Sequence, residues 1–233
     1  VRRMLLRMKA GTQAIRALLY YASGQVDRAT LGVTDARGLA DLLTPLSKAY
    51  ATDLGIEIAS LGIQVHGGMG FVEETGAAQH YRDARIAPIY EGTNGIQAAD
   101  LVGRKLSMDG GAVARRLVER IAGEAEGTLA DLAAATGLVL HWMQDEASID
   151  DRLGGSVPFL TMYATLVSGW LMAKQRAAAQ DELAGGDDPF LKGKIAAADY
   201  YLAAMVPEAT GLEAAATAGA EPLYALTAAE LAA

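Results

Sequence analysis

Glu91 has the setting in this sequence that is best suited to chemistry. It stands in a break between two helical patterns, within the run Ile89-Tyr-Glu-Gly-Thr-Asn-Gly-Ile-Gln97. A carboxylate in such a break can project into a cleft instead of onto a solvated helix face, and the glycines beside it let a ligand approach the backbone. The residues alone leave a second interpretation open, in which Glu91 is a solvated or capping carboxylate and Thr93 is a turn residue.

Two other segments precede this break. The first is the glycine-rich run Gln64-Val-His-Gly-Gly-Met-Gly-Phe71, and the second is Tyr81-Arg-Asp-Ala-Arg-Ile86. Glycines at a helix end can expose backbone amides to a ligand, although the same run is also typical of an ordinary glycine-capped helix end. Arg82 and Asp83 are neighbours and point apart on a helix, so we expect ion pairs across a helical bundle. We expect no catalytic role for His66.

The three segments, in this order and at this spacing, resemble the C-terminal signature of acyl-CoA dehydrogenases. That signature is a Q-x-x-G-G-x-G-[FY] loop, an R-D pair and an [IY]-Y-E-G-T motif. The resemblance covers at least residues 1–106. The extended form of the last motif, Ile89 to Lys105, is similar to the branch with an added C-terminal helical domain, to which methylthiopropionyl-CoA dehydrogenases belong. The resemblance implies an FAD flavoprotein of fatty acid metabolism that oxidises acyl-CoA thioesters.

The resemblance also implies a role for each residue of the last motif. Glu91 would remove the α-proton of the acyl-CoA while FAD accepts the β-hydride. The backbone N–H of Glu91 would stabilise the enolate as negative charge develops, and Gly92 would let the thioester lie close to the backbone. Exclusion of water by the flavin and the acyl chain would strengthen the base.

The same resemblance implies cofactor contacts in two places. Residues of the first loop would contact the FAD of a neighbouring subunit, and residues after Glu91 would approach the FAD phosphate or adenine. By position these residues are Gln64, Gly67 and Gly68 in the loop, and Thr93 and Gly95 after Glu91. The sequence departs from the family at Asn94-Gly95, where a serine and a longer polar residue are more usual, so the side-chain part of that contact should differ.

Composition and periodicity favour an all-α fold. Alanine and leucine dominate and Pro occurs only 6 times, which favours helices throughout. We predict a four-helix up-and-down bundle over residues 1–109 and a second helical domain over 110–233, divided at the Asp109-Gly110-Gly111 turn. Within the bundle, Thr44 is expected to cap a helix that begins at Pro45. The second domain carries no chemical signature, so we expect it to cover neighbouring domains or to make dimer contacts.

Charge and residue content restrict the possible partners. A formal net charge of -8 argues against nucleic acid. The absence of cysteine excludes disulfides and thiolate chemistry, and the three histidines lack the spacing of metal ligands, so no metal site is expected. No apolar run approaches the roughly 20 residues of a membrane span, so we expect a cytoplasmic location without membrane insertion. A helical pattern is already running at Val1, which indicates a fragment.

The family resemblance implies further partners and leaves alternatives. Electrons would pass from FAD to an electron-transferring flavoprotein, and the enzyme would be a homo-oligomer, a dimer or a tetramer. The family's N-terminal helical domain and middle β-domain are not in this sequence, so the fragment alone should be inactive. One alternative is an acyl-CoA oxidase, which reoxidises with oxygen, and another is a non-catalytic flavin-binding or interaction relative. A third is a stable helical piece that binds nothing.

Overall fold

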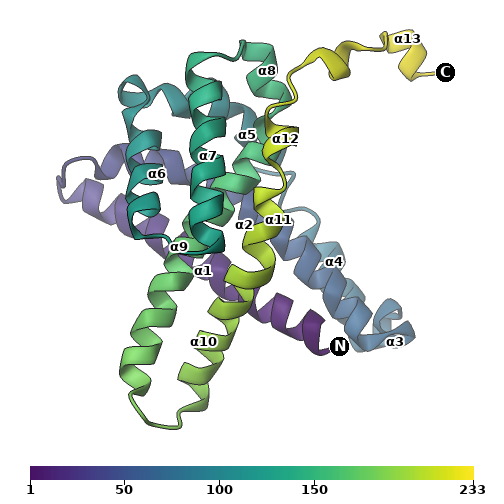
Figure 1. Cartoon of the computed structure of the whole chain (residues 1–233). Coiled ribbons are helices and arrows are strands. Elements are labelled where there is room, and N and C mark those ends of the chain that lie inside the picture. The colour runs from purple at the N-terminus through teal and green to yellow at the C-terminus, as the bar shows by residue number, and fades with distance from the viewer.

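The computed structural model describes all 233 residues and contains helices and turns but no β-strand, which confirms the all-α class (Figure 1). The first half holds α1 (Arg2–Thr30), α2 (Ala36–His66), α3 (Gly68–Phe71), α4 (Ala77–Ala84) and α5 (Asn94–Gly103). The second half holds α6 (Ala112–Glu124), α7 (Thr128–Asp145), α8 (Ile149–Gly154), α9 (Ser156–Leu183), α10 (Pro189–Tyr200), α11 (Val206–Thr210), α12 (Glu213–Ala216) and α13 (Ala228–Leu231). The four predicted helices of the first half correspond to α1, α2, α4 and α5.

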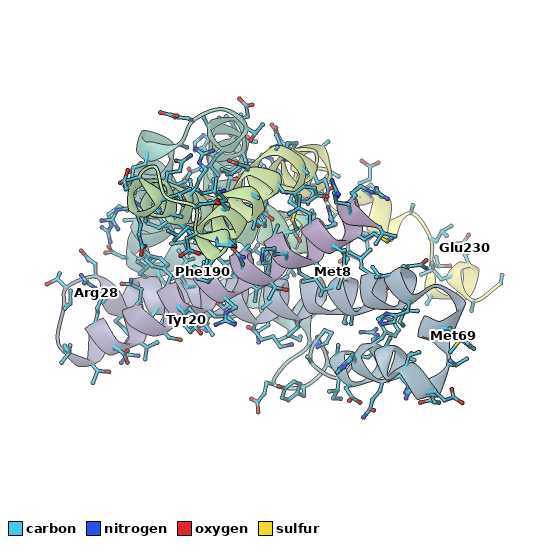
Figure 2. All side chains as sticks on the ribbon, turned by 90° about the horizontal axis from the view of Figure 1, so that it is seen from below. Met8, Tyr20, Arg28, Met69, Phe190 and Glu230 are labelled. Carbon is cyan, nitrogen blue, oxygen red and sulfur yellow. The ribbon has the colours of Figure 1, made fainter.

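The two long helices α1 and α2 lie side by side and run across the molecule (Figures 1 and 2). Ala10, Ala14 and Leu18 recur at helical spacing on the buried face of α1. Gly11 sits between them, and a Cβ there would lie 3.3 Å from side-chain atoms of both Leu54 and Ile58 on α2. Small residues on α1 therefore allow the close approach of the two helices.

The prediction that a helix begins at Pro45 is wrong. α2 runs without interruption from Ala36 to His66, with Pro45 inside it. The Thr44 hydroxyl does not cap a helix but donates to the Ala40 carbonyl one turn earlier, at 2.9 Å. A proline inside a helix costs about 3 kcal/mol, and here it is offset by burial, because Pro45 and its neighbours Leu43 and Leu46 all lie in the core.

The second half is organised around α9, which packs against α7, α10 and α1. Phe159 and Tyr163 of α9 are fully buried, and the Tyr163 hydroxyl donates to the Ala114 carbonyl on α6 at 2.8 Å. By length and composition α9 is apolar enough to cross a membrane, which the run-length argument from the sequence missed. Of its most apolar stretch, 72% is buried inside the protein, so this apolar surface forms the core of the fold.

The two halves share one core. A single cluster of 40 buried residues includes Leu42 and Leu101 from the first half and Phe159 from the second. The hydroxyls of Tyr50 on α2 and Tyr201, just before α11, are 2.6 Å apart in this core. The chain does turn at Asp109, Gly110 and Gly111, which all have positive φ. The division into domains at that turn stays a prediction, because the apolar core continues across it.

Arg7 makes a second connection between the halves. Its guanidinium binds Glu57 of α2 and forms a bidentate pair with Glu208 of α11, with both N–O distances 2.8 Å. These hydrogen bonds raise the pKa of Arg7 further above its usual value. Arg7 thus links α1, α2 and α11 through charge-assisted hydrogen bonds.

Candidate functional site

Glu91 lies in a short loop between α4 and α5 whose backbone is unusual. Its φ is +55°, and Gly92 after it has a φ of +78°. A non-glycine residue with positive φ is uncommon and persists only where its surroundings hold it. Positive φ at the first position of this pair turns the chain so that the Glu91 side chain is exposed at the surface. The local conformation therefore presents the carboxylate outward.

The loop is held on the middle of α2 by a network of hydrogen bonds. The Lys48 ammonium donates to the Gly92 carbonyl at 2.8 Å and to the Asn94 side-chain oxygen at 2.7 Å. The amide nitrogen of Asn94 in turn donates to Thr52 Oγ1 at 2.9 Å and to Asp53 Oδ1 at 2.7 Å. Three residues of α2 thus fix the start of α5 and the loop before it.

Three consecutive backbone amides of this loop are free. The N–H groups of Glu91, Gly92 and Thr93 make no hydrogen bond within the protein. The only hydrogen bond of Glu91 is the one that its carbonyl accepts from Gln97 Nε2, at 3.2 Å. The loop therefore presents an unpaired carboxylate and three unpaired N–H donors on consecutive residues. Such a set can take a proton and donate hydrogen bonds to an oxygen that gains negative charge.

Thr93 and Gly95 mark the start of α5. The Thr93 hydroxyl is the N-cap and accepts from the Ile96 N–H at 3.3 Å. Gly95 is exposed in the first turn of the helix, and a Cβ there would meet only the Thr93 hydroxyl, at 3.9 Å. Space beside Gly95 is therefore open, whereas the N–H groups of Asn94 and Ile96 already donate to the Pro88 carbonyl and the Thr93 hydroxyl.

The other predicted contact region is the end of α2. Gln64 is exposed in the last turn, Gly67 ends the helix with a φ of +62°, and Gly68 begins α3. A Cβ on Gly67 or Gly68 would meet nothing within 4 Å, so open space borders both glycines. Gly70 differs, because a Cβ there would lie 2.3 Å from the Ile63 carbonyl oxygen. Two glycines of the loop thus leave room outside the chain, and the third is required by internal packing.

The loop at the end of α2 and the Glu91 loop are well separated within one chain. Thr52, which binds Asn94, and Gln64 lie on the same straight helix. At ~1.5 Å of rise per residue they are about 18 Å apart along its axis. Met69 projects at one end of the molecule, far from Arg28 at the other (Figure 2). The structure therefore places the predicted site residues in two separate groups, Gln64 to Gly68 and Glu91 to Gly95.

Large apolar side chains are exposed around both groups. Phe71 beside the glycine loop is 82% exposed, and Met69, Ile89, Tyr90 and Ile96 are more than half exposed. Exposed apolar residues also occur elsewhere, for example Leu19 to Val33 and Leu223 to Leu231, so they do not by themselves mark one stretch as a binding surface.

The structure also shows residues that the sequence reasoning missed. Lys48 and Asp53 were not singled out, although a lysine within the apolar run from Leu46 to Tyr50 was a usable signal of a polar contact. Asn94 was noted only as a departure from the family pattern. Its amide is fully engaged with α2, which explains why a side chain of this size stands there.

Three other polar residues have structural partners. Arg82 forms a bidentate pair with Glu73 nearby in the chain, with N–O distances of 2.9 and 2.7 Å, so the expected pairing across the bundle is wrong. His66 Nδ1 lies 2.8 Å from the Gly62 carbonyl oxygen at the end of α2. His141 Nδ1 lies 2.8 Å from Asp145 on the same helix.

Two family models match the chain. Residues 1–106 match the model described as "Acyl-CoA dehydrogenase, C-terminal domain". Residues 100–227, more than half of the chain, match the model "Acetyl-CoA dehydrogenase C-terminal like". A curated relative, 3-methylmercaptopropionyl-CoA dehydrogenase of Ruegeria pomeroyi, is 46% identical over 229 residues. That alignment covers 89% of this chain and 39% of the relative, so the chain spans about two fifths of the relative's length.

Two solved structures share the fold. An acyl-CoA dehydrogenase of Bacillus anthracis complexed with FAD matches 97% of this chain and 42% of its own, with a TM-score of 0.66 and 20% identity. ACDH-11 of Caenorhabditis elegans in complex with C11-CoA matches 86% of this chain and 35% of its own, with a TM-score of 0.64 and 23% identity. From the two family models, the chain belongs to the acyl-CoA dehydrogenase family and corresponds to its C-terminal helical part.

Proposed function

We propose that the protein to which this chain belongs is an FAD-dependent acyl-CoA dehydrogenase that introduces an α,β double bond into an acyl-CoA thioester. The observation that carries this proposal is the Glu91 loop. It combines an exposed, unpaired carboxylate with free N–H groups on Glu91, Gly92 and Thr93, in a backbone conformation that is fixed from α2. The relative from Ruegeria pomeroyi, named for such an activity, supports the same conclusion.

In the proposed reaction the Glu91 carboxylate takes the α-proton of the thioester. As the Cα–H bond breaks, negative charge develops on the thioester oxygen, and the Glu91 N–H donates a hydrogen bond to it. Gly92 has no side chain to obstruct this approach. FAD, when bound, supplies the acceptor for the β-hydride. Because the loop is held before substrate arrives, little reorganisation is needed when charge develops.

The two groups of site residues lie too far apart for one compact ligand, so we propose that each group contacts a different FAD. The open glycines Gly67 and Gly68, with Gln64 beside them, would contact one FAD, and Thr93 and Gly95 at the N-terminus of α5 would bind FAD phosphate or adenine. Because the groups are about 18 Å apart along α2, we propose that Gln64, Gly67 and Gly68 bind the FAD of a neighbouring subunit.

This arrangement requires a homo-oligomer, which we propose to be a dimer or a tetramer. The exposed apolar residues between 69 and 96 support it, because they give the subunits a surface to bury. We further propose that the enzyme acts in the cytoplasm and that, as family membership implies, it passes electrons to an electron-transferring flavoprotein. Substitution of Gln64 by Ala should then lower the FAD content of the purified full-length protein, and light scattering should report a multiple of the subunit mass.

The test of the proposed reaction is anaerobic bleaching of the flavin in the full-length protein. Addition of a short- or long-chain acyl-CoA that is a substrate should rapidly bleach the visible absorbance of the flavin in the wild-type protein. Glu91→Gln keeps the shape of the side chain but removes the base, so it should abolish bleaching while FAD stays bound. Glu182→Gln changes an exposed glutamate at the end of α9 and serves as the matched control. Equal bleaching in wild type and Glu91→Gln would reject Glu91 as the base.

The alternatives have their own outcomes in the same experiment. If air is admitted after bleaching and one hydrogen peroxide forms for each flavin that is reoxidised, the protein is an acyl-CoA oxidase. A protein that retains FAD but is not bleached by any acyl-CoA would be the non-catalytic relative.

A further inference from the structure

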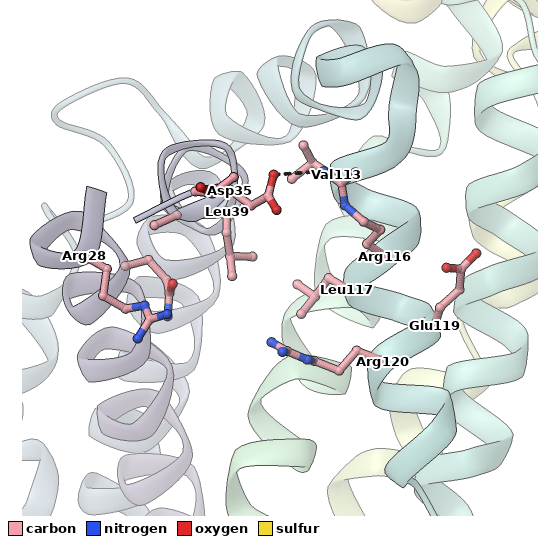
Figure 3. A pocket seen from close by; sticks show the side chains of 11 residues that line it. Arg28, Asp35, Leu39, Val113, Arg116, Leu117, Glu119 and Arg120 are labelled. Atoms are coloured by element: carbon pink, nitrogen blue, oxygen red, sulfur yellow. Dashed lines mark ion pairs between the residues drawn. The ribbon is translucent and has the colours of Figure 1, made fainter. Parts of the chain in front are cut away.

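A cavity that contains no residue of the Glu91 loop has the features of a binding site. It is an open hollow of about 600 Å³ between the C-terminal end of α1, the start of α2, and α6 (Figure 3). This volume lies within the range of small-molecule sites, ~300–1,000 Å³. Arg28 in its wall and Met69 beside the glycine-rich loop lie at opposite ends of the molecule (Figure 2). The cavity also shares no lining residue with the glycine-rich loop or the Glu91 loop.

Two arginines face each other across this cavity. Arg28 enters from α1 and Arg120 from α6, and their guanidinium groups point toward the same space (Figure 3). Neither forms an ion pair with any carboxylate of the chain. Two like charges directed at one space repel each other, and the arrangement becomes favourable when an anion lies between them. This holds although the whole chain carries a formal net charge of -8.

The carboxylates near the cavity have other partners or point away. At one end Asp35 lies 3.6 Å from Arg116. At the other end Glu124 accepts from Lys174 at 2.6 Å and from the indole N–H of Trp170 at 2.7 Å. Glu119 also belongs to the cavity lining, but its carboxylate extends along the other side of α6 from Arg120 (Figure 3). Arg28 and Arg120 thus have no carboxylate in direct ion-pair contact, although Glu124 lies near enough to Arg120 for their charges to attract.

Gln25 adds a polar group that the protein does not satisfy. It is only 9% exposed, and its side-chain amide makes no hydrogen bond within the protein. It lines the cavity together with Arg28 and Arg120, and the same three residues line a second hollow that continues toward Trp170. Its amide faces open hollows and is therefore available to a ligand in the cavity.

The remaining wall is apolar. Leu39 from α2 and Val113 and Leu117 from α6 line the same hollow, and Leu117 is buried. A charged head with a short apolar body matches this division, because the head can lie between the arginines while the body contacts the leucines and the valine. An inorganic ion would leave the apolar wall uncovered.

We propose that this cavity, bounded by Arg28, Arg120 and Gln25, binds a small organic oxyanion: a carboxylate or phosphate group on a short apolar body. The two guanidiniums bind the oxyanion, and the Gln25 amide donates to one of its oxygens. This site is independent of the flavin reaction.

Isothermal titration of the full-length protein with hexanoate, hexyl phosphate and inorganic phosphate tests the proposal. We expect saturable binding of hexanoate or hexyl phosphate at one site per chain, and the tighter of the two identifies the head group. Arg28→Gln and Arg120→Gln should each weaken this binding at least tenfold. Arg3→Gln, the same change about 37 Å away along α1 at ~1.5 Å per residue, should alter it less than twofold.

Two further measurements distinguish a loss of anion binding from a failure of the dehydrogenase proposal and from a loss of folding. Glu91→Gln should leave the affinity unchanged, so failure of the proposed dehydrogenase reaction would not affect this result. Circular dichroism of each variant checks that the helices are intact. The proposal is overturned if neither organic anion saturates, if all arginine variants bind equally, or if inorganic phosphate binds as tightly as hexyl phosphate.

Discussion

The Lys48 ammonium on α2 donates a 2.8 Å hydrogen bond to the carbonyl of Gly92, the residue that follows Glu91. This contact joins the middle of the longest helix to the loop that carries the candidate base. Positive φ at both Glu91 and Gly92 is a conformation that the loop would not keep alone. Lys48 and the Asn94 network therefore determine where the Glu91 carboxylate lies.

Substitution of Lys48 by Met should slow the reaction without loss of the cofactor. Methionine is also long and unbranched but lacks the donor to Gly92, so Glu91 should move from its position. We expect the rate of anaerobic flavin reduction to fall by about 10- to 100-fold, with FAD content unchanged. Lys192→Met, at an exposed lysine that pairs with Asp187 at the start of α10, is the control. An unchanged rate in Lys48→Met would remove Lys48 from the positioning of Glu91.

Two glycines in the same segment should respond in opposite ways to alanine. Gly92 has a φ of +78°, and a Cβ there would lie 3.2 Å from Gln97 Nε2, so Gly92→Ala should destabilise the protein by about 1 kcal/mol or more. Gly95 lies within α5 with no close neighbour for a Cβ, so Gly95→Ala should be neutral or stabilising by up to ~1 kcal/mol. Urea unfolding followed by circular dichroism measures both, and equal effects would contradict the loop conformation.

The buried pair of Tyr50 and Tyr201 should show strong coupling. Their hydroxyls are 2.6 Å apart, and burial raises the pKa of each, so both stay neutral at ordinary pH. Tyr201→Phe leaves the Tyr50 hydroxyl buried without this partner, which should cost about 1–3 kcal/mol. The double variant with Tyr50→Phe should cost less than the sum of the single variants. Additive losses in the unfolding free energy would show that the two hydroxyls act separately.

The sequence could predict the fold class and the place of the candidate base, because both depend on local signals. Alanine-rich periodicity predicts helices wherever they occur, and the glycine breaks on each side of Glu91 predict a loop. The prediction that a helix starts at Pro45 was wrong because the outcome there depends on contacts between residues in the packed core, not on local signals. Local rules favour a helix end at proline, but burial of Pro45 with Leu43 and Leu46 is a property of the packed core.

The contacts that hold the site could not be predicted, because they join residues that are distant in the sequence. Lys48 meets Gly92 only after α2 and α5 have packed together. Arg28 and Arg120 belong to two different helical patterns, and each alone is an ordinary surface arginine. Only the packing of α6 beside the end of α1 brings them to one cavity.

Gly155 should tolerate no side chain. A Cβ there would lie 2.0 Å from the Ala216 carbonyl oxygen, where the start of α9 packs against α12. Gly155→Ala must displace one backbone from the other, and we expect a loss of about 3 kcal/mol. Gly123→Ala, in α6 with nothing within 4 Å, should stabilise by ~0.5–1 kcal/mol. Thermal unfolding of the two variants against wild type measures the difference, and similar melting temperatures would contradict this contact.

Asp151 should make the attachment of the C-terminal segment sensitive to acid. Its carboxylate accepts from the Ala220 N–H at 2.8 Å and from the Ser148 hydroxyl at 2.7 Å. The bond from Ser148, then that from Ala220, lowers the pKa of Asp151 below its usual value near 3.8. A lowered pKa in the folded state means that the contact stabilises the fold above pH 3.8 and is lost as the pH falls through the folded-state value.

The Ala220 amide reports this titration directly in a series of NMR spectra from neutral to acid pH. Its shift should change with a midpoint below 3.8, the usual value for an aspartate. The change should disappear in Asp151→Asn and persist in Asp150→Asn, which alters the exposed neighbour in the first turn of α8. A midpoint at or above 3.8, or a titration that survives in Asp151→Asn, would show that another group binds the Ala220 amide.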